Sequence, residues 1–273
     1  MMTSPRRIIT LTTDFGLKDH YVAAMKGTIL KVCPSAKIID ITHLITRHNV
    51  REASYILYQS SIFFPDESIH VAVVDPSVGT ERKRLAIRTK CGYLVGPDNG
   101  ILIPAARSQG ILDLVETSRT EYMASSISTT FEGRDVFAHI AGHLANGVRL
   151  HELGPNCIEP VDLSWGSFRV EPTIMVGEIL HVDWFGNITT NIPTSSIMSW
   201  ETGHLVRVNI GRISRIATMS ETYCERARRA NAPLVIKGSG GFLEIAVNKG
   251  AASTLFNVRP DSMVTIDYGP AET

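Results

Sequence analysis

Acidic residues stand at the ends of three strand-like runs in the first part of the chain. Asp14 and Asp75 each open a loop that contains glycine, in TDFGLKD and VDPSVGTER, whereas Asp40 is followed by Ile-Thr-His and fits within its strand. A carboxylate at a strand end can accept two hydrogen bonds from a ribose diol, as the acids of dinucleotide-binding sheets do. The competing interpretation of Asp14 is a residue that only caps a turn.

Two other motifs point to metals, and the sequence supports neither. Asp14-Phe15-Gly16 matches the magnesium-binding tripeptide of protein kinases, but the chain has no Gly-rich loop before it and no HRD loop. The phosphate-binding patterns GxxxxGK[ST] and strand-linked GxGxxG are also absent. His139 and His143 have the i, i+4 spacing of a metal pair without the Glu of HExxH. We interpret both histidines as residues that pack the helix against the rest of the fold, and we expect no metal and no cofactor.

The composition carries no charge surplus. Of 273 residues, 44% are hydrophobic, and 27 Lys and Arg balance 27 Asp and Glu. Zero net charge argues against bulk nucleic-acid binding, which needs cations to neutralise phosphates. No apolar run approaches the roughly 20 residues of a membrane span, and Asp14 interrupts the first one too early for a signal peptide. Four scattered cysteines without a CxxC pair indicate reduced thiols and a cytoplasmic protein.

The first half of the chain alternates strand-like and helix-like segments. β-branched apolar runs alternate with segments whose apolar residues recur at helical spacing. Expected strands are 7–14, 37–43 and 68–75, expected helices are 21–33, 50–64 and 133–148, and a hairpin of 84–90 and 92–98 is expected beside them. This order predicts an α/β domain with a mostly parallel sheet and flanking helices, which binds ligands at the carboxyl ends of its strands.

From about residue 165 onward, short strand-like runs follow one another, from TIMVGEILHVD to SMVTIDYG, and glycines and prolines interrupt them. Such a series predicts a smaller all-β domain, either a barrel or a sandwich. The expected division is an α/β domain over 1–165 and a barrel-like domain over 173–273, with the boundary in WGSFRVEPT.

Five stretches in fixed order carry a more specific signal: TTDFGLKDHYVAAMKG, VVDPSVGTERK, TTFEGRDVFA, DWFGNITTN and GSGGFLEIAVNKG. With them the chain resembles the S-adenosyl-L-methionine (SAM) hydroxide adenosyltransferase family, the SAM hydrolases, which are related to fluorinases and chlorinases. The resemblance implies an N-terminal α/β domain, a C-terminal β domain and a homotrimer. It places the ligand between the N-domain of one subunit and the C-domain of its neighbour. The implied reaction is attack of water or hydroxide at ribose C5′, which releases adenosine and methionine.

The resemblance also implies roles for residues at the nucleoside end of the substrate. Asp14 matches the family's acid that grips the 2′- and 3′-hydroxyls. Asn187 matches an Asn that reads the adenine edge, for which an amide offers both a donor and an acceptor. Phe185 is similar to an aromatic residue packed beside the adenine.

At the amino-acid end, Asp19 matches an acid near the methionine amino group, and Asp183 resembles a second contact to that ammonium. Ser239 resembles the Ser that holds the methionine carboxylate. Taken alone, the motifs around Asp183 and Ser239 are equally typical of tight turns.

The water-activating group shows one departure from the family. Asp75 and Arg82 match two members of its Asp–Arg–His set, but this chain reads TFEGRD where the hydrolases read TFHGRD, so Glu132 replaces the histidine. Two close carboxylates resist ionising together, which predicts a raised pKa for one of them. Glu132 then either keeps a proton and donates, or pairs with Arg82. A third interpretation is an acid that only favours a helix N-terminus.

Asp75, Arg82 and Glu132 are therefore the candidate catalytic residues of a SAM hydrolase. The alternative is a SAM- or adenosine-binding protein with weak or no catalysis, because the family histidine is missing. A nucleosidase or phosphorylase is a weaker third hypothesis, since no phosphate site is visible. Halogenation is disfavoured because Asp75 and Glu132 would repel a halide, and the related halogenases carry Tyr at the Asp75 position.

Overall fold

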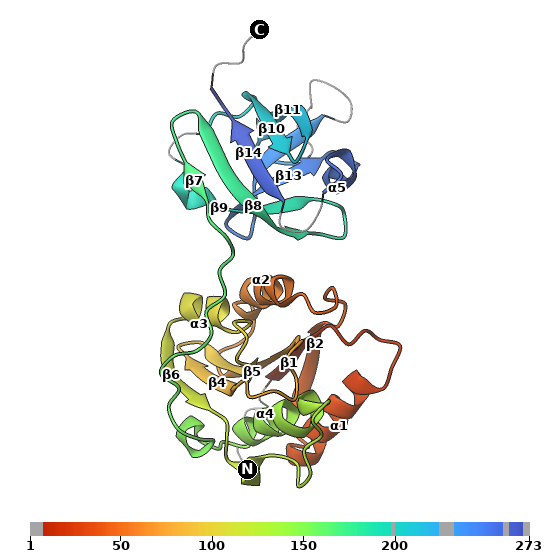
Figure 1. Cartoon of the computed structure of the whole chain (residues 1–273), viewed down its shortest axis with the longest axis vertical. Coiled ribbons are helices and arrows are strands. Elements are labelled where there is room, and N and C mark those ends of the chain that lie inside the picture. Colours follow the sequence, from red (N-terminus) through yellow and green to blue (C-terminus); the bar gives the residue numbers. More distant parts are fainter. Residues whose placement is uncertain (1–7, 198–199, 224–231, 259–261, 270–273) are drawn as a thin grey trace. The chain divides into compact units, whose positions relative to one another are not determined.

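The computed structural model describes residues 8–197, 200–223, 232–258 and 262–269, which form two compact units. The first unit ends at Leu163 and the second begins at Ser164 (Figure 1). Each unit has its own sheet and its own hydrophobic core.

The first unit is a six-stranded sheet in the order β2-β1-β3-β5-β4-β6. The strands are β1 Ile8–Thr13, β2 Lys37–Thr42, β3 Ser68–Val73, β4 Arg84–Thr89, β5 Gly92–Pro97 and β6 Ile111–Glu116. Strands β2, β1, β3 and β5 are parallel, and β4 runs antiparallel between β5 and β6. The mostly parallel sheet and its added hairpin are confirmed.

Helices cover both faces of this sheet (Figure 1). They are α1 Tyr21–Val32, α2 Val50–Ser61, α3 Ile103–Gln109 and α4 Ala138–Ala145, with a π-helical turn, η2 Gly133–Phe137, directly before α4 and 3-10 turns at Thr120–Tyr122 and Leu150–Glu152. The expected helix 133–148 is therefore one continuous helical segment that begins with a π-helical turn and ends at Ala145. The sequence did not reveal α3 and β6, because α3 has only 7 residues and the strand ILDLVE has an exposed, mixed pattern.

The alternation of β3 decides which side of the sheet receives each side chain. Val71 and Val73 belong to the core that α1 and α4 cover, whereas Ala72 and Val74 belong to the core beneath α2 and α3. Successive side chains of an extended strand point to opposite faces. Asp75 therefore follows Val73 toward the α4 side, where Phe137 is also buried.

The second unit is a closed barrel. Its strands are β7 Arg169–Val170, β8 Ile174–Val182, β9 Ile188–Pro193, β10 Leu205–Ile210, β11 Ile213–Ser220, β12 Pro233–Lys237, β13 Phe242–Val247 and β14 Met263–Asp267, joined by a 3-10 turn at Thr194–Ser196 and the short helix α5 Ala252–Leu255. Strand β14 pairs with both β10 and β8, which closes seven strands into a ring. Closure removes the exposed edges that an open sheet would leave. The barrel-like architecture is confirmed.

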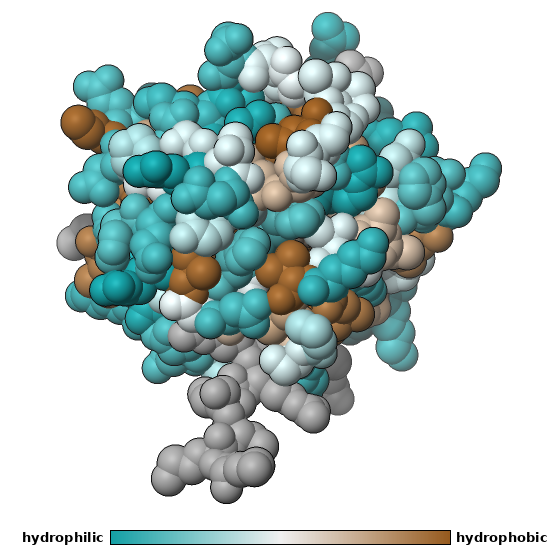
Figure 2. Space-filling view, turned by 90° about the horizontal axis from the view of Figure 1, so that it is seen from below, coloured by the Kyte–Doolittle hydropathy of each residue, from teal (hydrophilic) through white to brown (hydrophobic). Residues whose placement is uncertain are grey.

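The surface shows no strongly apolar region in the view of Figure 2. Most of that face is hydrophilic, and its hydrophobic residues lie in small separate groups. Scattered exposed hydrophobic residues of this kind are normal for a folded protein. Within the described ranges, no helix is both long and apolar enough to cross a membrane.

Strands β1 and β3 bury a histidine between them. His70 is 3% exposed, lies opposite Thr10 in the parallel register, and has its Nδ1 atom 2.8 Å from the Thr10 hydroxyl. Phe64 packs edge-on against the imidazole ring. Burial lowers the pKa of His70 to about 4, because the imidazolium form would lose its hydration.

This histidine predicts a loss of stability in acid. Unfolded His70 takes up a proton near pH 6.5, whereas the folded pKa is about 4, so the free energy of unfolding falls as pH drops through that window. By pH 4 the loss is on the order of 3 kcal/mol. Denaturant titrations between pH 7 and 4 should show a flatter profile for His70→Gln, and no flattening for the exposed His151→Gln. An unchanged slope in His70→Gln would contradict this.

Candidate active site

A cavity of about 570 Å³ lies at the carboxyl ends of β1 and β3. Parallel sheets bind ligands at this end, because the loops that follow neighbouring strands converge there. Four loop regions supply the lining residues Asp14, Phe15, His20, Tyr21, Arg47, His48, Val73, Asp75, Val78, Ser128, Thr130, Phe131, Glu132, Gly133 and Arg134. The loops after β1 and β3 and the segment before η2 therefore meet at one place.

Asp75 is gripped by Arg82 at the wall of this cavity. The Arg82 Nε atom donates to both carboxylate oxygens at 3.0 and 2.9 Å, and Nη2 adds a second bond to Oδ2. Ser77 Oγ donates to Oδ1 at 3.2 Å. Only 5% of the Asp75 side chain and 7% of the Arg82 side chain are exposed. This charge-assisted, bidentate grip fixes the carboxylate in orientation as well as in charge.

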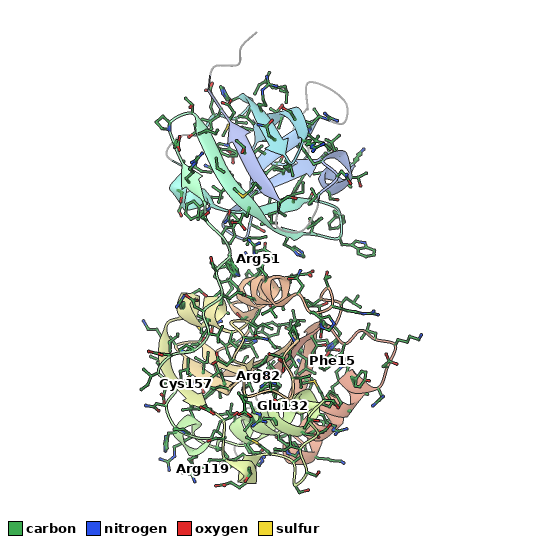
Figure 3. All side chains as sticks on the ribbon, viewed as in Figure 1. Phe15, Arg51, Arg82, Arg119, Glu132 and Cys157 are labelled. Carbon is green, nitrogen blue, oxygen red and sulfur yellow. The ribbon has the colours of Figure 1, made fainter. Side chains whose placement is uncertain are left out.

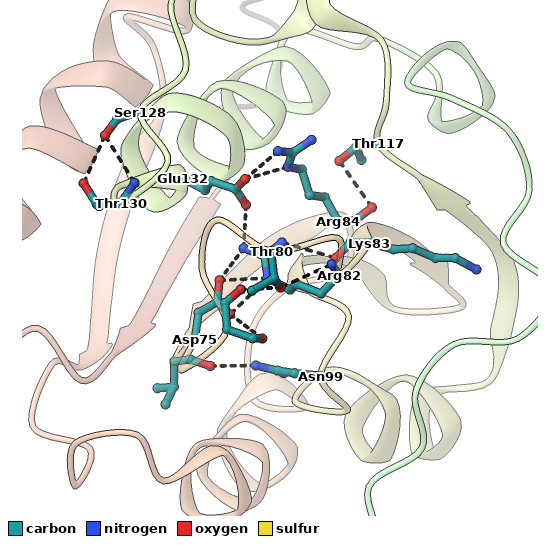
Figure 4. Close-up of polar contacts among 12 residues, drawn as sticks. Asp75, Thr80, Arg82, Lys83, Arg84, Asn99, Thr117, Ser128, Thr130 and Glu132 are labelled. Atoms are coloured by element: carbon teal, nitrogen blue, oxygen red, sulfur yellow. Dashed lines mark hydrogen bonds and ion pairs between the residues drawn. The ribbon is translucent and has the colours of Figure 1, made fainter.

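Glu132 shares the same guanidinium group (Figure 4). Arg82 Nη2 donates to Glu132 Oε2 at 2.5 Å, and Arg84 donates to Oε1 from Nε at 3.1 Å and from Nη2 at 2.5 Å. The Glu132 side chain is 3% exposed. Two arginines and two acids thus form a continuous ladder, Asp75–Arg82–Glu132–Arg84.

The pKa of Glu132 is lowered, so the expected raised pKa is wrong for this residue. Burial pushes the Glu132 pKa upward, but hydrogen bonds and charge from Arg84 and Arg82 outweigh it. The expected pairing with Arg82 is confirmed. Glu132 is also the N-cap residue of η2, as the helix-terminus interpretation expects, although its side chain makes no capping hydrogen bond. Burial likewise lowers the Arg82 pKa, and Asp75 and Glu132 raise it overall.

Sequence reasoning missed Arg84. It lies in the charged run ERKR, which is typical of a solvated surface, and it begins strand β4. The available signal was the two-residue spacing from Arg82, since side chains two apart in an extended segment share a face. The second guanidinium is the reason that Glu132 stays ionised beside Asp75.

Gly79 brings the loop after β3 against the segment that leads to Glu132. Its φ is +80°, a left-handed value that suits glycine, and a Cβ atom there would lie 2.4 Å from the carbonyl oxygen of Thr129. No side chain fits in that space. The close approach holds the Asp75–Arg82 loop and the Glu132 segment in contact.

Asp14 lies on another wall of the cavity, and one of its carboxylate oxygens accepts a hydrogen bond. Its Oδ2 atom accepts a hydrogen bond from the backbone N–H of His48 at 2.9 Å. Beside it, the rings of Phe15, Tyr21 and Phe131 pack together with centroids 5.1 to 5.9 Å apart. Phe15 and Glu132 line the same cavity (Figure 3). Sequence reasoning did not foresee this aromatic wall, which gives the cavity a flat apolar side.

Three of the expected substrate residues line a second hollow in the barrel unit. Asp183, Phe185 and Asn187 border a space of about 550 Å³ together with Tyr223, Val247, Lys249 and Gly250. Asp183 accepts from the Asn187 backbone N–H at 2.8 Å and from its side-chain amide at 2.9 Å. Phe185 is 75% exposed. The turn DWFGN therefore exposes the Phe185 ring to solvent, while Asp183 holds the half-buried Asn187 side chain.

Asp19 and Ser239 lie outside both hollows. Asp19 is exposed in the loop after β1, and Ser239 is exposed in the turn between β12 and β13. The expected site residues thus fall into two groups, one in each unit. Asp14, Asp75 and Glu132 line the first cavity, with Arg82 bonded directly behind them.

A metal site does not appear among the described residues, where no three His, Cys, Asp or Glu side chains cluster suitably. His139 and His143 share helix α4, as their spacing predicts. Burial lowers the pKa of each, and His143 packs edge-on against Tyr122.

The fold and the site define a two-unit protein in which a parallel α/β sheet carries a buried acid–arginine cluster and a closed barrel follows it. The SAM hydroxide adenosyltransferase N-terminal domain matches residues 9–154, and the C-terminal domain of the same family matches residues 177–265. The chain belongs to the SAM hydroxide adenosyltransferase family.

Individual relatives agree over nearly the whole length. A protein from Salinispora arenicola named (R)-S-adenosyl-L-methionine hydrolase is 37% identical, over 96% of this chain and 98% of its own. A protein of the same name from Methanocaldococcus jannaschii is 38% identical over 92% of each chain. A fluorinase from an Actinoplanes species is 24% identical over 95% of this chain and 97% of its own. A crystal structure of an uncharacterized conserved protein from Thermotoga maritima superposes with a TM-score of 0.88 at 38% identity, over 95% of this chain and 99% of that one.

The ladder predicts a large stability cost for neutralising Glu132. In Glu132→Gln the buried guanidinium group of Arg82 and the partly exposed one of Arg84 lose their shared anion, and we expect the free energy of unfolding at pH 7 to fall by about 3 kcal/mol. Denaturant titration measures this, with Asp162→Asn as control, because Asp162 pairs with Arg107 on the surface and such pairs contribute little.

The same difference should depend on pH. Folded Glu132 has a pKa below its ordinary 4.5, so the stabilisation is complete above about pH 4.5 and fades as pH falls through the lower folded value. A cost in Glu132→Gln no larger than in Asp162→Asn would show that the ladder does not stabilise the fold.

Proposed function

We propose that this protein hydrolyses S-adenosyl-L-methionine to adenosine and L-methionine. The observation that carries the proposal is a buried carboxylate, Asp75, held by Arg82 at the wall of a cavity that Asp14 also lines. The hydrolase names of relatives at 37 and 38% identity support the same reaction. The substrate needs no cofactor, because its sulfonium already makes methionine a good leaving group.

In the proposed reaction, the oxygen of a water molecule attacks ribose C5′ opposite the C5′–S bond. The C5′–S bond breaks, its electron pair goes to sulfur, and neutral methionine leaves. Asp75 orients the water and accepts its proton, and Arg82 keeps the carboxylate in place. Asp14 holds the ribose 2′- and 3′-hydroxyls, so that C5′ points toward Asp75.

Glu132 acts in this scheme through Arg82. Both of its oxygens accept hydrogen bonds from guanidinium groups, so Glu132 holds Arg82 and Arg84 in place. Glu132 also keeps Arg82 from shifting away from Asp75.

The barrel residues complete the substrate site in this proposal. Asn187 reads the adenine edge, Phe185 packs beside the adenine, Asp183 and Asp19 face the methionine ammonium, and Ser239 binds its carboxylate. We propose a homotrimer in which the barrel unit of one subunit supplies these groups to the α/β unit of its neighbour. The exposed Phe185 ring and the separate hollows of the two units support this arrangement. A cytoplasmic location belongs to the same proposal.

Replacing the water-orienting acid tests the reaction. In Asp75→Asn we expect kcat to fall by about 10²- to 10⁴-fold, the usual contribution of a positioned proton acceptor, while adenosine binding persists. Chromatography of adenosine formed from SAM measures turnover, and Asp66→Asn on the exposed loop before β3 is the control. If the unaltered protein forms no adenosine from SAM, the proposed function fails.

Restoring the family histidine tests the ladder. We expect Glu132→His to lower kcat, because a neutral imidazole leaves Arg84 unpaired next to Arg82. Adding Arg84→Met should then recover turnover by about tenfold relative to Glu132→His alone, the size of coupling expected between contacting groups. Initial rates of the single and double variants measure this coupling. Higher turnover in Glu132→His than in the unaltered protein would show that Glu132 only impairs catalysis.

A further inference from the structure

We infer that His43, held between Asp40 and Thr13, is a positioning residue that aims the Asp14 carboxylate at a ribose diol. The inference rests on the ribose-binding role proposed above for Asp14. It assigns a role to the third strand-associated acid, Asp40, which lies on β2 and does not line the cavity.

The three side chains form a continuous chain of polar contacts. His43 is 3% exposed, and its Nδ1 atom lies 2.8 Å from the hydroxyl of Thr13, which is fully buried. On the opposite side of the ring, Nε2 lies 3.1 Å from Asp40 Oδ1, a short contact that is not well aligned as a hydrogen bond. The other oxygen of Asp40 accepts from Lys26 Nζ at 2.5 Å.

The hydrogen positions follow from the acceptors present. The Thr13 hydroxyl accepts the backbone N–H of Phe15 at 3.2 Å, so its own hydrogen is free to point at Nδ1 of His43. The imidazole then carries its hydrogen on Nε2, facing the Asp40 carboxylate. The contacts run from a surface ion pair, through a buried ring, to the backbone of the residue after Asp14.

Backbone contacts from the same segment hold the loop at further points. The His43 carbonyl accepts the Gly16 N–H at 2.8 Å, and the Thr13 carbonyl accepts the Ile45 N–H at 3.4 Å. Five residues after His43, the His48 N–H donates to Asp14 itself at 2.9 Å. Hydrogen bonds from residues 43–48 therefore fix the conformation of residues 13–16.

A direct chemical role for this Thr–His–Asp series is excluded by its position. Thr13 is 0% exposed and neither Thr13 nor His43 lines the cavity, so the hydroxyl cannot reach a substrate. Asp14 and Phe15 of the first segment and Arg47 and His48 of the second do line it. The series can influence binding only through the placement of these residues.

Strand β1 provides a matched comparison. Thr10 contacts His70 Nδ1 at 2.8 Å, so it forms the same Thr–His pair in the same strand, three residues before Thr13. Loss of either hydroxyl leaves a buried imidazole nitrogen without its partner and costs similar stability. Only the Thr13 pair is connected to the Asp14 loop.

The test compares adenosine with 2′,3′-dideoxyadenosine, which lacks the diol, by calorimetry on the full-length protein. We expect Thr13→Val to weaken adenosine binding by about tenfold, as loss of a positioning hydrogen bond allows, and to leave dideoxyadenosine binding unchanged. Thr13→Ser keeps the hydroxyl and should restore the preference for adenosine. Thr10→Val should lower the melting temperature without changing that preference.

Asp40→Asn provides a variant that keeps the core intact, because the Asp40 side chain is 36% exposed. We expect it to reduce the preference for adenosine by about threefold, since the neutral amide attracts the His43 ring less. If Thr13→Val does not fold, Asp40→Asn alone decides the outcome.

Asp14→Ala separates this inference from the proposed function. If Asp14→Ala leaves the preference for adenosine intact, Asp14 does not bind the diol, and the ribose-binding role fails. If Asp14→Ala abolishes the preference while Thr13→Val and Asp40→Asn retain it, the positioning role of His43 alone is overturned. Equal losses for the two ligands in Thr13→Val and Thr10→Val would likewise show a merely structural role.

Discussion

Two buried carboxylates can share the wall of one cavity here because two guanidinium groups neutralise them. Arg82 lies between Asp75 and Glu132, and Arg84 binds the far oxygen of Glu132. Removing Arg82 would leave the Asp75 carboxylate buried without its arginine partner, which costs several kcal/mol. The ladder also ties together the loop after β3, the start of β4 and the segment before η2. The rest of the first unit is arranged so that these three elements meet.

The direction of the strands and the local turns bring the ladder residues together. The alternation of β3 turns Asp75 toward the α4 side, and Gly79 allows the loop to approach Thr129 more closely than any side chain would permit. A second set of contacts, from His43 to His48, fixes the end of β1 in the same way. Neighbouring loops thus hold Asp14 and Asp75 at the ends of their strands. The site is preorganised, so binding a substrate costs less conformational entropy.

Glu132 stands where the sequence resemblance places a histidine, and it gives the site an anion that two arginines hold in place. A histidine beside Arg82 would be a neutral acceptor, whereas Glu132 is an anion that needs Arg84. Glu132 and Arg84 therefore form one functional unit in this chain, and their effects on turnover should be interdependent. Family membership indicates the reaction, and the ladder indicates which side chains hold Asp75 in position for that reaction.

The sequence by itself determined most of the strands and helices, though not α3 and β6, together with the mostly parallel sheet and the barrel-like unit, because hydrophobic periodicity and turn residues are local signals. Five motifs in fixed order indicated the family. The sequence also singled out Asp75, Arg82 and Glu132, and it left open whether Glu132 keeps a proton. Only the tertiary structure decided that question, since Arg84 lies 48 residues from Glu132 along the chain and contacts it through the fold. The same holds for His43 and Thr13, which are 30 residues apart and meet where two parallel strands end. Such contacts depend on which residues the fold brings together and on how deeply it buries them. Burial and contacts in space change the energy of a charged group far more than adjacent residues in the sequence do.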